Sequence, residues 1–410
     1  MIPHLQNIRA VVVVAMVLVS AATPAAQTLT EAESLRLGLA RGEVAELARG
    51  RIGAATADAQ EAGLWANPTL EYARDRGRDG ATAREESWRI AQTFDLAGRR
   101  GLQRAAGEQR IVAAAADARL FRSELAAEIR RGFFELVLHE AQLAAVEAWV
   151  QGFADIERIV GKLRSAGEAS GYDLRRLARE RQAAQARRAQ TQAGLERARE
   201  QFAALLGTDL AQYAIAGDLL PAAPADLAAL LARLDARPDL AALAARASAA
   251  ELEQRAAQRG WIPEVTVGVG TKLSDDNFNR QASTLFSVAI PLPVFDRQQA
   301  GASRAAAQAG ALHAERALAR SRAAGQVRGL HRQATQLVAA AADYRRAAVA
   351  PSAELVRIAE AAYRGGEASV LELLDAYRGA LEAQATALEL EWAARTATIE
   401  LDQLTGSHSE

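Results

Sequence analysis

The chain repeats a unit of about half its own length, and this duplication restricts its architecture more than any single motif does. The tetrapeptide Gly-Glu-Ala-Ser begins at Gly167 and again at Gly366, 199 residues later. Two prolines that each follow closely on a tryptophan, Pro68 and Pro263, lie 195 residues apart. Because two distant pairs share nearly the same offset, the sequence predicts two copies of one structural unit.

The composition favours long helices and excludes several classes of function. The 410 residues carry 49 Lys and Arg against 50 Asp and Glu, so the charge gives no case for nucleic-acid binding. Only 5% of the residues are aromatic, which suits helices that meet through small side chains. The absence of cysteine removes disulfides, thiolate metal sites and a lipidated N-terminal cysteine.

Residues 1–26 have the pattern of a secretory signal peptide. Arg9 precedes an apolar run at 11–19, and a stretch of small residues at 20–26 follows it. The alternative, an N-terminal membrane anchor, needs roughly 20 apolar residues, more than this run supplies. We therefore expect export with cleavage near Ala25 or Ala26, and any insertion into a membrane would have to use strands.

Each copy has the order helix, strand, loop, strand, very long helix, tip and long helix. The first copy, residues 27–217, begins with a proline-free helix predicted from Ala32 to about Ala62. The second copy occupies residues 218–406 and is followed by a tail at 407–410. Alternating apolar and polar residues predict four strands, at 68–75, 86–95, 264–272 and 283–291.

The four strands have about the length, roughly 9–11 residues, that crosses a bilayer when the strand is tilted. Tyr72, Trp88 and Phe286 are available to lie at a membrane interface. Taken alone, the alternation fits half-buried hairpins on a soluble domain equally well. The signal peptide and the long helices favour membrane strands.

Very long helices connect the strands to the two tips. No proline lies between Leu96 and a tip near residue 167, and Pro351 is the one proline between Val294 and a tip near residue 366. At 1.5 Å per residue each stretch would extend roughly 105 Å. Apolar residues in heptad spacing predict coiled coils, although Arg378 interrupts a column of the second returning helix.

The helix that returns from the first tip has a weaker pattern, because Arg181 and Arg188 stand in its heptad column. Such charges are typical of a helix that meets water on both sides or lines a wet channel. An ordinary surface helix with poor periodicity would look the same, and the sequence leaves both interpretations open.

Neither the strands nor the hairpins can complete a structure within one chain. Four strands cannot close a membrane barrel, which needs about eight, and an open edge in lipid leaves backbone groups unsatisfied. Two hairpins of this length cannot bury their faces within a compact globule. Both elements therefore predict an oligomer with a shared β-barrel that continues into a shared helical tube.

With this order and this duplicate spacing, the chain resembles the TolC family of outer-membrane efflux channels over essentially its whole mature length. The resemblance rests on the strand openings at 67–70 and 262–265, the strand-to-helix junctions at 94–100 and 291–297, and the second tip at 363–376. It implies a mainly α fold with a small membrane β-barrel portion, assembled as a homotrimeric α/β-barrel tunnel. It also implies a place in the cell outer membrane, a helical tunnel in the periplasm, and docking to a periplasmic adaptor protein and an inner-membrane RND-type pump.

Two segments resemble the branch of that family that serves heavy-metal and cation resistance pumps. They are Asn-Pro-Thr-Leu at the first strand and Leu-Pro-Val-Phe-Asp-Arg after the fourth. The resemblance implies an exit duct that passes metal cations from pump and adaptor across the outer membrane. Many relatives carry a lipidated N-terminal cysteine, and this chain has none, so we expect outer-membrane lipid to hold it through the barrel alone.

The resemblance also implies a periplasmic aperture at the second tip. Glu372 and Asp375 lie three residues apart on the returning helix, so their carboxylates share one face, and they match the acidic ring of the family. Tyr363 matches a residue that holds the closed tip, and Arg364 lies near Ala368, where relatives carry a basic partner. Six carboxylates from three copies would favour cations and raise one another's pKa values. The simpler alternative is that acids at a helix start complement the dipole.

The predicted adaptor-docking surface lies at both tips. The glycines there serve the turns, and the serines can cap the helices that follow. The surface comprises Gly167, Glu168, Ser170, Asp173, Arg175, Arg176, Gly366, Glu367 and Ser369.

No catalytic, cofactor-binding or metal-binding constellation is predicted, and we expect the chain not to be an enzyme. No two histidines make a metal-ligand spacing with a carboxylate on the same face, and His139 lies on an apolar seam. Gly268 and Gly270 lie in a strand rather than in a turn that opens a helix, which argues against a phosphate loop. Two alternatives from other classes stay open: a periplasmic adaptor, which would have a single hairpin, and a secreted structural coiled coil.

Overall fold

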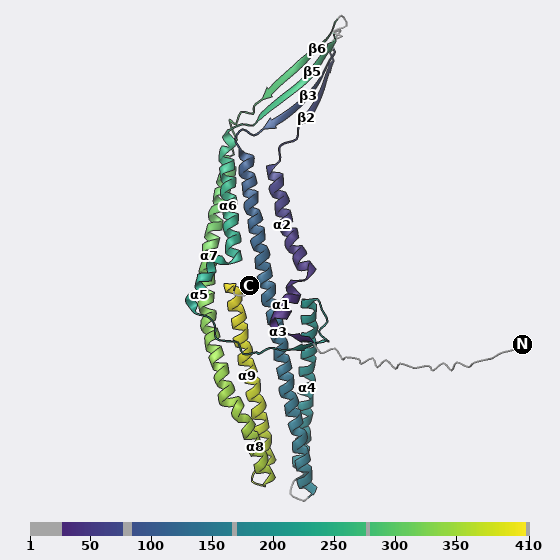
Figure 1. Cartoon of the computed structure of the whole chain (residues 1–410), viewed down its shortest axis with the longest axis vertical. Helices are drawn as coiled ribbons and strands as arrows, with labels where there is room; N and C mark the ends of the chain where they lie inside the picture. Colours follow the sequence, from purple (N-terminus) through teal and green to yellow (C-terminus); the bar gives the residue numbers. More distant parts are fainter. Residues whose placement is uncertain (1–26, 77–83, 166–169, 276–278, 407–410) are drawn as a thin grey trace, which may run out of the picture.

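The computed structural model describes residues 27–76, 84–165, 170–275 and 279–406. The predicted signal peptide, the first-tip residues Gly167 and Glu168, and the tail at 407–410 lie outside the described residues. The molecule is elongated, with a four-stranded sheet at one end and the tips of two helical hairpins at the other (Figure 1). This order of elements confirms the predicted duplicated unit of helix, two strands and long hairpin.

The sheet has the strand order β2-β3-β5-β6, and all neighbours are antiparallel. Its strands are β2 (Thr69–Arg76), β3 (Arg84–Phe94), β5 (Val265–Asp275) and β6 (Arg280–Ala289). The two strands of each copy form a hairpin, and β3 pairs with β5 to join the copies. A separate parallel pair, β1 (Gln27–Leu29) with β4 (Tyr213–Ile215), lies near the middle of the molecule.

The N-terminal helical region contains two helices instead of the single predicted one. The helix expected from Ala32 to about Ala62 is divided into α1 (Glu31–Leu39) and α2 (Gly42–Gly63). Arg41 separates them, with extended backbone at φ −56° and ψ 136°. Its guanidinium donates to the carbonyl oxygens of Ala204 and Leu205, both at 2.9 Å, so tertiary hydrogen bonds at the end of a distant helix fix the break.

The first hairpin consists of α3 (Arg99–Ser165), a helix of 67 residues, and α4 (Gly171–Leu206). Three α4 arginines that face α3 form ion pairs with glutamates across the hairpin, at 2.7–3.1 Å. The pairs are Arg181 with Glu157, Arg188 with Glu147 and Arg199 with Glu140. The arginines that weaken the heptad pattern of α4 therefore have partners within the hairpin, in the manner of charges that flank a coiled-coil seam.

The outgoing arm of the second hairpin contains an irregular turn. Its outgoing arm comprises α7 (Gln299–Tyr344), a π-helical turn at Arg345–Val349 and α8 (Ala350–Arg364), and α9 (Val370–Thr405) returns. The π turn directly precedes α8, and Pro351 lies in the first turn of that helix. Because proline removes one hydrogen bond and displaces the preceding turn, a wider turn at this point keeps the long helix continuous.

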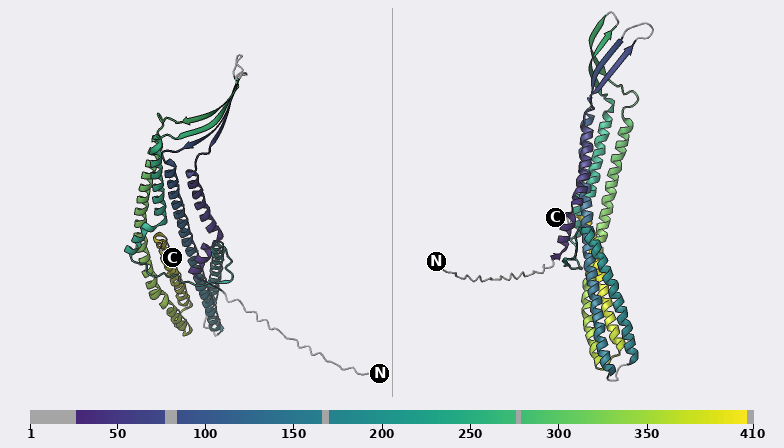
Figure 2. Two further views of the ribbon diagram at one scale, coloured as in Figure 1. Left: turned by 45° about the horizontal axis from the view of Figure 1, so that its top comes forward. Right: turned by 90° about the vertical axis from the view of Figure 1, so that its right-hand side faces the viewer.

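Shorter helices connect the two copies and pack beside the long ones. They are α5 (Leu227–Ala232), a 3₁₀ turn at Arg233–Ala236, α6 (Pro238–Gln258) and a 3₁₀ turn at Arg259–Trp261. Below the sheet, α2, α3, α6 and α7 lie side by side, and the lower half contains α3 with α4 and α8 with α9 (Figure 2). Among the described residues, no helix combines the length and the hydrophobicity needed to cross a lipid bilayer.

The core consists of separate clusters along the molecule, as an elongated shape requires. The largest lies near the middle, around Phe133, Phe134 and Phe202. A second cluster lies near the tips and joins the two hairpins through Phe153 of α3 and Leu373 of α9. The tips are therefore held together by apolar packing between the hairpins as well as within each of them.

The junctions between strand and helix differ in the residue that takes up a left-handed conformation. In the first copy this residue is Gly98, at φ 66°, and in the second it is Gln298, at φ 61°. A side chain with a Cβ costs about 1–2 kcal/mol in this region. We expect Gln298→Gly to raise the free energy of unfolding by up to about 1 kcal/mol, and Gly98→Gln to lower it by about 1–2 kcal/mol. Denaturant unfolding of the detergent-extracted protein would measure the stability change in each variant. Equal changes of the same sign would show that the left-handed backbone at these two positions is not the cause.

Candidate functional site at the hairpin tips

Both returning helices begin with the same reciprocal cap. In the first, the Asp173 N–H donates to the Ser170 hydroxyl at 3.1 Å, and the Ser170 N–H donates to the Asp173 carboxylate at 3.3 Å. In the second, the Glu372 N–H donates to the Ser369 hydroxyl at 3.3 Å, and the Ser369 N–H donates to the Glu372 carboxylate at 2.6 Å. Each pair is a capping box, which fixes where the helix starts. The two helices also end alike, at left-handed Gly207 and Gly406.

The carboxylate of Glu372 therefore has a structural role as well as an exposed position. The Ser369 backbone N–H and hydroxyl donate to it, and these bonds hold its pKa below the ordinary value for glutamate. Asp375 lies one turn further along the same helix and is also exposed. The arrangement keeps Glu372 ionised at neutral pH and places a second carboxylate beside it on the same face.

Tyr363 lies at the end of α8 and is buried in the cluster that joins the hairpins. The same cluster contains Phe153 of α3, Leu177 of α4 and Leu374 of α9, so it is built from both hairpins. Burial raises the pKa of the phenol, and the negative charge of Asp173 on the first tip adds to that shift. The predicted tip residues Tyr363 and Asp173 thus belong to different hairpins, and the charge of one affects the pKa of the other.

Arg364 makes an ion pair within its own helix rather than with the opposite tip. Its guanidinium donates to Glu360 at 3.0 Å, one turn earlier in α8. The other carboxylate oxygen of Glu360 accepts from the Tyr377 hydroxyl of α9 at 2.5 Å. Burial and this hydrogen bond strongly raise the pKa of Tyr377. Glu360 therefore links the two arms of the second hairpin. No sequence pattern had identified Glu360 as a candidate.

An ion pair between a buried glutamate and a partly exposed arginine also connects the two hairpins. Glu180 of α4 is buried, and the Arg378 guanidinium of α9 lies 2.5 Å from its carboxylate. Arg378 lowers the pKa of Glu180 as the largest contribution, and Arg179 adds to it. Sequence reasoning missed this contact, but a signal was present, since Arg378 interrupts an otherwise apolar heptad column. A charge in such a column indicates a partner on a neighbouring helix.

Other predicted residues lie at the turn of the second tip and on the sheet. Gly366, at φ 75°, takes the left-handed conformation that the turn of the second tip needs, and Glu367 is exposed beside it. Tyr72 and Trp88 are paired across β2 and β3, with ring centroids 4.6 Å apart, and Phe286 is exposed on β6. Within the described part of the chain, no three His, Asp or Glu side chains are grouped so that they could hold a metal ion.

The packing between the hairpins depends on a glycine in α3. A Cβ atom at Gly152 would lie 2.2 Å from the Tyr377 ring, so the ring rests directly on the helix backbone. We expect Gly152→Leu to displace Tyr377 from Phe153 and Glu360 and to lower the free energy of unfolding by about 1–3 kcal/mol. Denaturant unfolding followed by circular dichroism would measure the change.

A matched control is available nine residues further along α3. A Cβ at Gly161 would meet no heavy atom of the described residues within 4 Å. Gly161→Leu should be neutral or stabilise by about 0.5–1 kcal/mol, because leucine has the higher helix propensity. Similar losses in both variants would show that the contact with Tyr377 is not responsible.

Comparison with known proteins agrees with this architecture. Residues 231–407 match the family model described as "Outer membrane efflux protein". The nickel-cobalt-cadmium resistance protein NccC of Alcaligenes xylosoxydans xylosoxydans is 25% identical over 68% of this chain and 64% of its own length. The cobalt-zinc-cadmium resistance protein CzcC of Cupriavidus metallidurans is 30% identical over 53% of this chain and 52% of its own. The matches thus span about half to two thirds of these relatives.

Solved structures share the fold over nearly the whole chain. CusC superposes with a TM-score of 0.76 at 20% identity, over 92% of this chain and 91% of its own. The outer-membrane channel OprN gives a TM-score of 0.74 at 21% identity, over 92% and 89%. The outer membrane protein VceC of Vibrio cholerae gives 0.73 at 18% identity, over 92% and 96%. The family match thus covers residues 231–407, and the solved structures share the duplicated fold over nearly the whole chain.

Proposed function

We propose that the chain is one protomer of a homotrimeric outer-membrane channel, the exit duct of a tripartite efflux system. One observation carries the proposal: the four-stranded sheet has two outer strands, β2 and β6, that each pair on one side only within the described residues. Since open edges are not tolerated in lipid, three sheets joined edge to edge would form the closed barrel that one chain cannot form. The two long hairpins below the sheet would then line a tube that continues the barrel.

The proposed cargo is metal cations. The relatives NccC and CzcC are described as resistance proteins for nickel, cobalt, zinc and cadmium, which supports this class of solute. The exposed acids Glu372 and Asp375 at the second tip supply the matching charge, since rings of carboxylates favour the passage of cations. A duct of this kind needs no binding site for a single ion.

The aperture is proposed to lie at the hairpin tips, where Glu372 and Asp375 of three copies would meet. Tyr363 would hold the tip closed, and its burial in an apolar cluster built from both hairpins supports this role. Arg364, together with Glu360 and Tyr377, would stiffen the second hairpin rather than tie it to the first. Hydrogen bonds from Ser369 lower the pKa of Glu372, and like charges in the assembly would oppose that shift.

The partners are proposed to be a periplasmic adaptor protein and an inner-membrane RND-type pump. The exposed residues Glu367 and Ser369 at one tip and Ser170 at the other would form part of the docking surface, with Gly366 supplying the turn. Asp173 fixes the helix start at the first tip and would contribute charge there. Charge reversal at both tips should abolish efflux with an adaptor present, and unchanged efflux would refute this surface.

The direct test is fractionation of the expressed protein, with the mass of the detergent-extracted species. We expect to recover the protein from the outer membrane as a trimer. In a planar bilayer, we expect this trimer to give single-channel currents carried by nickel, cobalt, zinc or cadmium. A soluble periplasmic monomer or dimer would overturn the proposal. A trimeric channel that carries anions in preference to these cations would overturn only the proposed cargo.

A further inference from the structure

The sheet has an apolar and a polar face, and the apolar face is the more exposed of the two. Successive residues of a strand point to opposite faces. On β3, Trp88 and Ile90 are exposed, whereas Arg89 on the other face is partly buried and Ala91 is buried. A soluble domain would bury its apolar face. The observed pattern is that of a membrane barrel, whose apolar side meets lipid and whose polar side faces a water-filled interior.

The polar face consists of the odd-numbered residues of β2, β3 and β6 and the even-numbered residues of β5. Among the described strand residues, its charged side chains are three acids, Glu71, Asp75 and Glu85, and two bases, Arg89 and Lys272. Glu71 lies directly opposite Arg89 and forms an ion pair with it. Lys272 pairs with Glu85 at 2.7 Å. Each base therefore has a carboxylate beside it, and the polar face carries no excess of positive charge.

Two glycines of β5 leave room for the Arg89 side chain to lie along the sheet. Gly270 is directly opposite Arg89, and Gly268 lies next to it on the same face. A Cβ atom at Gly268 would lie 3.0 Å from Cδ of Arg89 and 2.5 Å from the Ser287 hydroxyl oxygen. A Cβ atom at Gly270 would overlap the backbone carbonyl oxygen of Trp88. Glycine within a strand often marks a site where another group approaches closely, and at Gly268 the stem of Arg89 is one such group.

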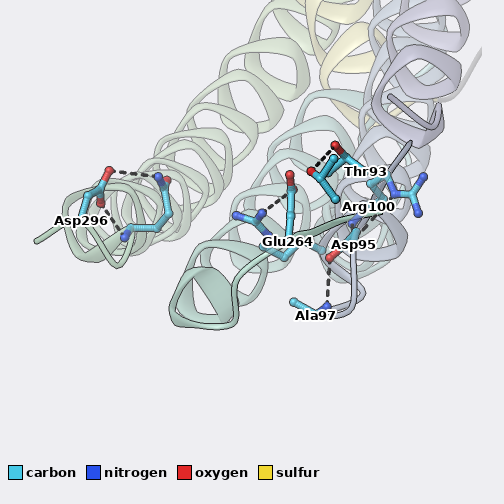
Figure 3. Close-up of polar contacts among 9 residues, drawn as sticks. Thr93, Asp95, Ala97, Arg100, Glu264 and Asp296 are labelled. Carbon is cyan, nitrogen blue, oxygen red and sulfur yellow. Dashed lines mark hydrogen bonds and ion pairs between the residues drawn. The ribbon is translucent and has the colours of Figure 1, made fainter. Parts of the chain in front are cut away.

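Toward the helices, the polar face continues with neutral side chains. The hydroxyl groups of Thr93 and Thr266 lie 2.9 Å apart and share a hydrogen bond between β3 and β5 (Figure 3). Within the described strands, Glu71 and Arg89 are therefore the charged residues of the polar face that lie nearest to the helical part of the molecule.

We propose that the ion pair of Glu71 with Arg89 lines the water-filled interior of the barrel and controls which ions the outer end of the channel admits. Glu71 neutralises Arg89 and holds its side chain against the wall, so that metal cations pass this level without meeting an unpaired positive charge. Three unpaired guanidinium groups at one level would instead favour anions, because rings of arginine are typical of anion pores. Glu71 and Arg89 together are thus a selectivity-determining pair.

The inference rests on the proposed function, because only a closed barrel of three sheets has an interior. It adds a selectivity element in the barrel, at the opposite end of the molecule from the acids of the proposed aperture (Figure 1). The two elements act differently. The acids at the tips attract cations, whereas the pair in the barrel works by cancelling a positive charge.

A cysteine reporter can measure the electrostatic potential beside this pair, and the absence of cysteine from the chain makes the label unique. Thr69→Cys places a thiol on the polar face of β2, about 7 Å along the strand from Glu71. Outer-membrane vesicles that contain the trimer are treated with a positively charged or a negatively charged methanethiosulfonate reagent of similar size. Mass spectrometry of the recovered protein gives the rate of modification. The reagents enter the barrel from its outer end, so the rates do not depend on the aperture at the tips.

We expect Glu71→Gln to lower the ratio of the positive reagent's rate to the negative reagent's rate about fivefold in about 10 mM salt, because one charge at about 7 Å acts on the two reagents in opposite directions. Arg89→Gln should raise the ratio by a similar factor, and the two substitutions together should return it close to the parent value. Glu86→Gln provides the control. Glu86 pairs with Arg74 at 3.3 Å on the apolar face of the same two strands, so its loss should leave the ratio unchanged.

A ratio that stays unchanged in both Glu71→Gln and Arg89→Gln would overturn the proposal, and so would an equal decrease in Glu86→Gln. If Glu71→Gln failed to assemble, Arg89→Gln would still decide the question through the opposite shift. Val288→Cys tests the proposed function separately, because Val288 is exposed on the apolar face of β6. Fast modification of that thiol by both reagents would mean that the apolar face lies in water, and the membrane barrel itself would then be refuted.

Discussion

Arg345→Ala should destabilise the protein by about 3 kcal/mol at neutral pH, because it leaves a buried carboxylate without its partner. Arg345 begins the π-helical turn and donates to both oxygens of Glu391 on α9, at 2.6 and 2.7 Å. The Glu391 side chain is fully buried, whereas that of Arg345 is half exposed. The estimate therefore lies at the lower end of the range for broken buried pairs.

The loss of stability in Arg345→Ala should become smaller as the pH falls. Burial raises the pKa of Glu391 above its ordinary value, and the pairing with Arg345 opposes the shift only in part. A carboxyl whose pKa is raised on folding favours the native state while protonated, and this stability is lost as the pH rises through the folded pKa. Without Arg345 that pKa rises further, so the difference between variant and parent should narrow on acidification from pH 7 toward pH 5.

The neighbouring arginine provides the control. Arg346 pairs with Asp343 in the same helix, and both side chains are largely exposed, so Arg346→Ala should cost less than about 1 kcal/mol and show no comparable pH dependence. Adding Glu391→Leu to Arg345→Ala should recover most of the lost stability, since it removes the unpaired buried charge. Denaturant unfolding at several pH values would measure all three proteins. Equal losses for Arg345→Ala and Arg346→Ala would refute the explanation.

The duplicated architecture could be predicted from the sequence because its signals are local and occur twice. The repeated tip motif, the proline-free stretches and the alternating apolar residues can each be recognised locally, and the fold follows from their order. The break at Arg41 could not be predicted, because its cause is a pair of hydrogen bonds to the distant end of α4. The local sequence around Arg41 contains no helix-breaking proline.

The candidate site could be predicted only in part. The capping residues Ser170 and Ser369 are evident from spacing alone, since the acid three residues later completes a recognisable motif. The contacts of Glu180 with Arg378 and of Gly152 with Tyr377 join different hairpins. Such contacts depend on how the hairpins are placed relative to one another, and no local pattern determines that.

The aperture proposed at the second tip predicts a large change in ion selectivity when its charges are removed. In Glu372→Gln with Asp375→Asn, a trimer would lose six carboxylates from one narrow opening. We expect the ratio of cation to anion permeability in a planar bilayer to fall on the order of tenfold in about 10 mM salt, where the Debye length is about 30 Å. In about 1 M salt, where that length is about 3 Å, the difference from the parent should largely disappear.

These substitutions, together with a control, distinguish the loss of charge at the aperture from a loss of helix structure. Glutamine can replace glutamate in a capping box, so Glu372→Gln should preserve the start of α9 and its helical signal. Glu354→Gln removes an equally exposed charge from α8, three turns before the tip, and should leave selectivity unchanged if the aperture sets it. Because hydrogen bonds from Ser369 lower the pKa of Glu372, the parent should stay cation-selective on mild acidification. Selectivity that is unaffected by the double variant, or reduced equally by Glu354→Gln, would place the controlling charges elsewhere in the tunnel.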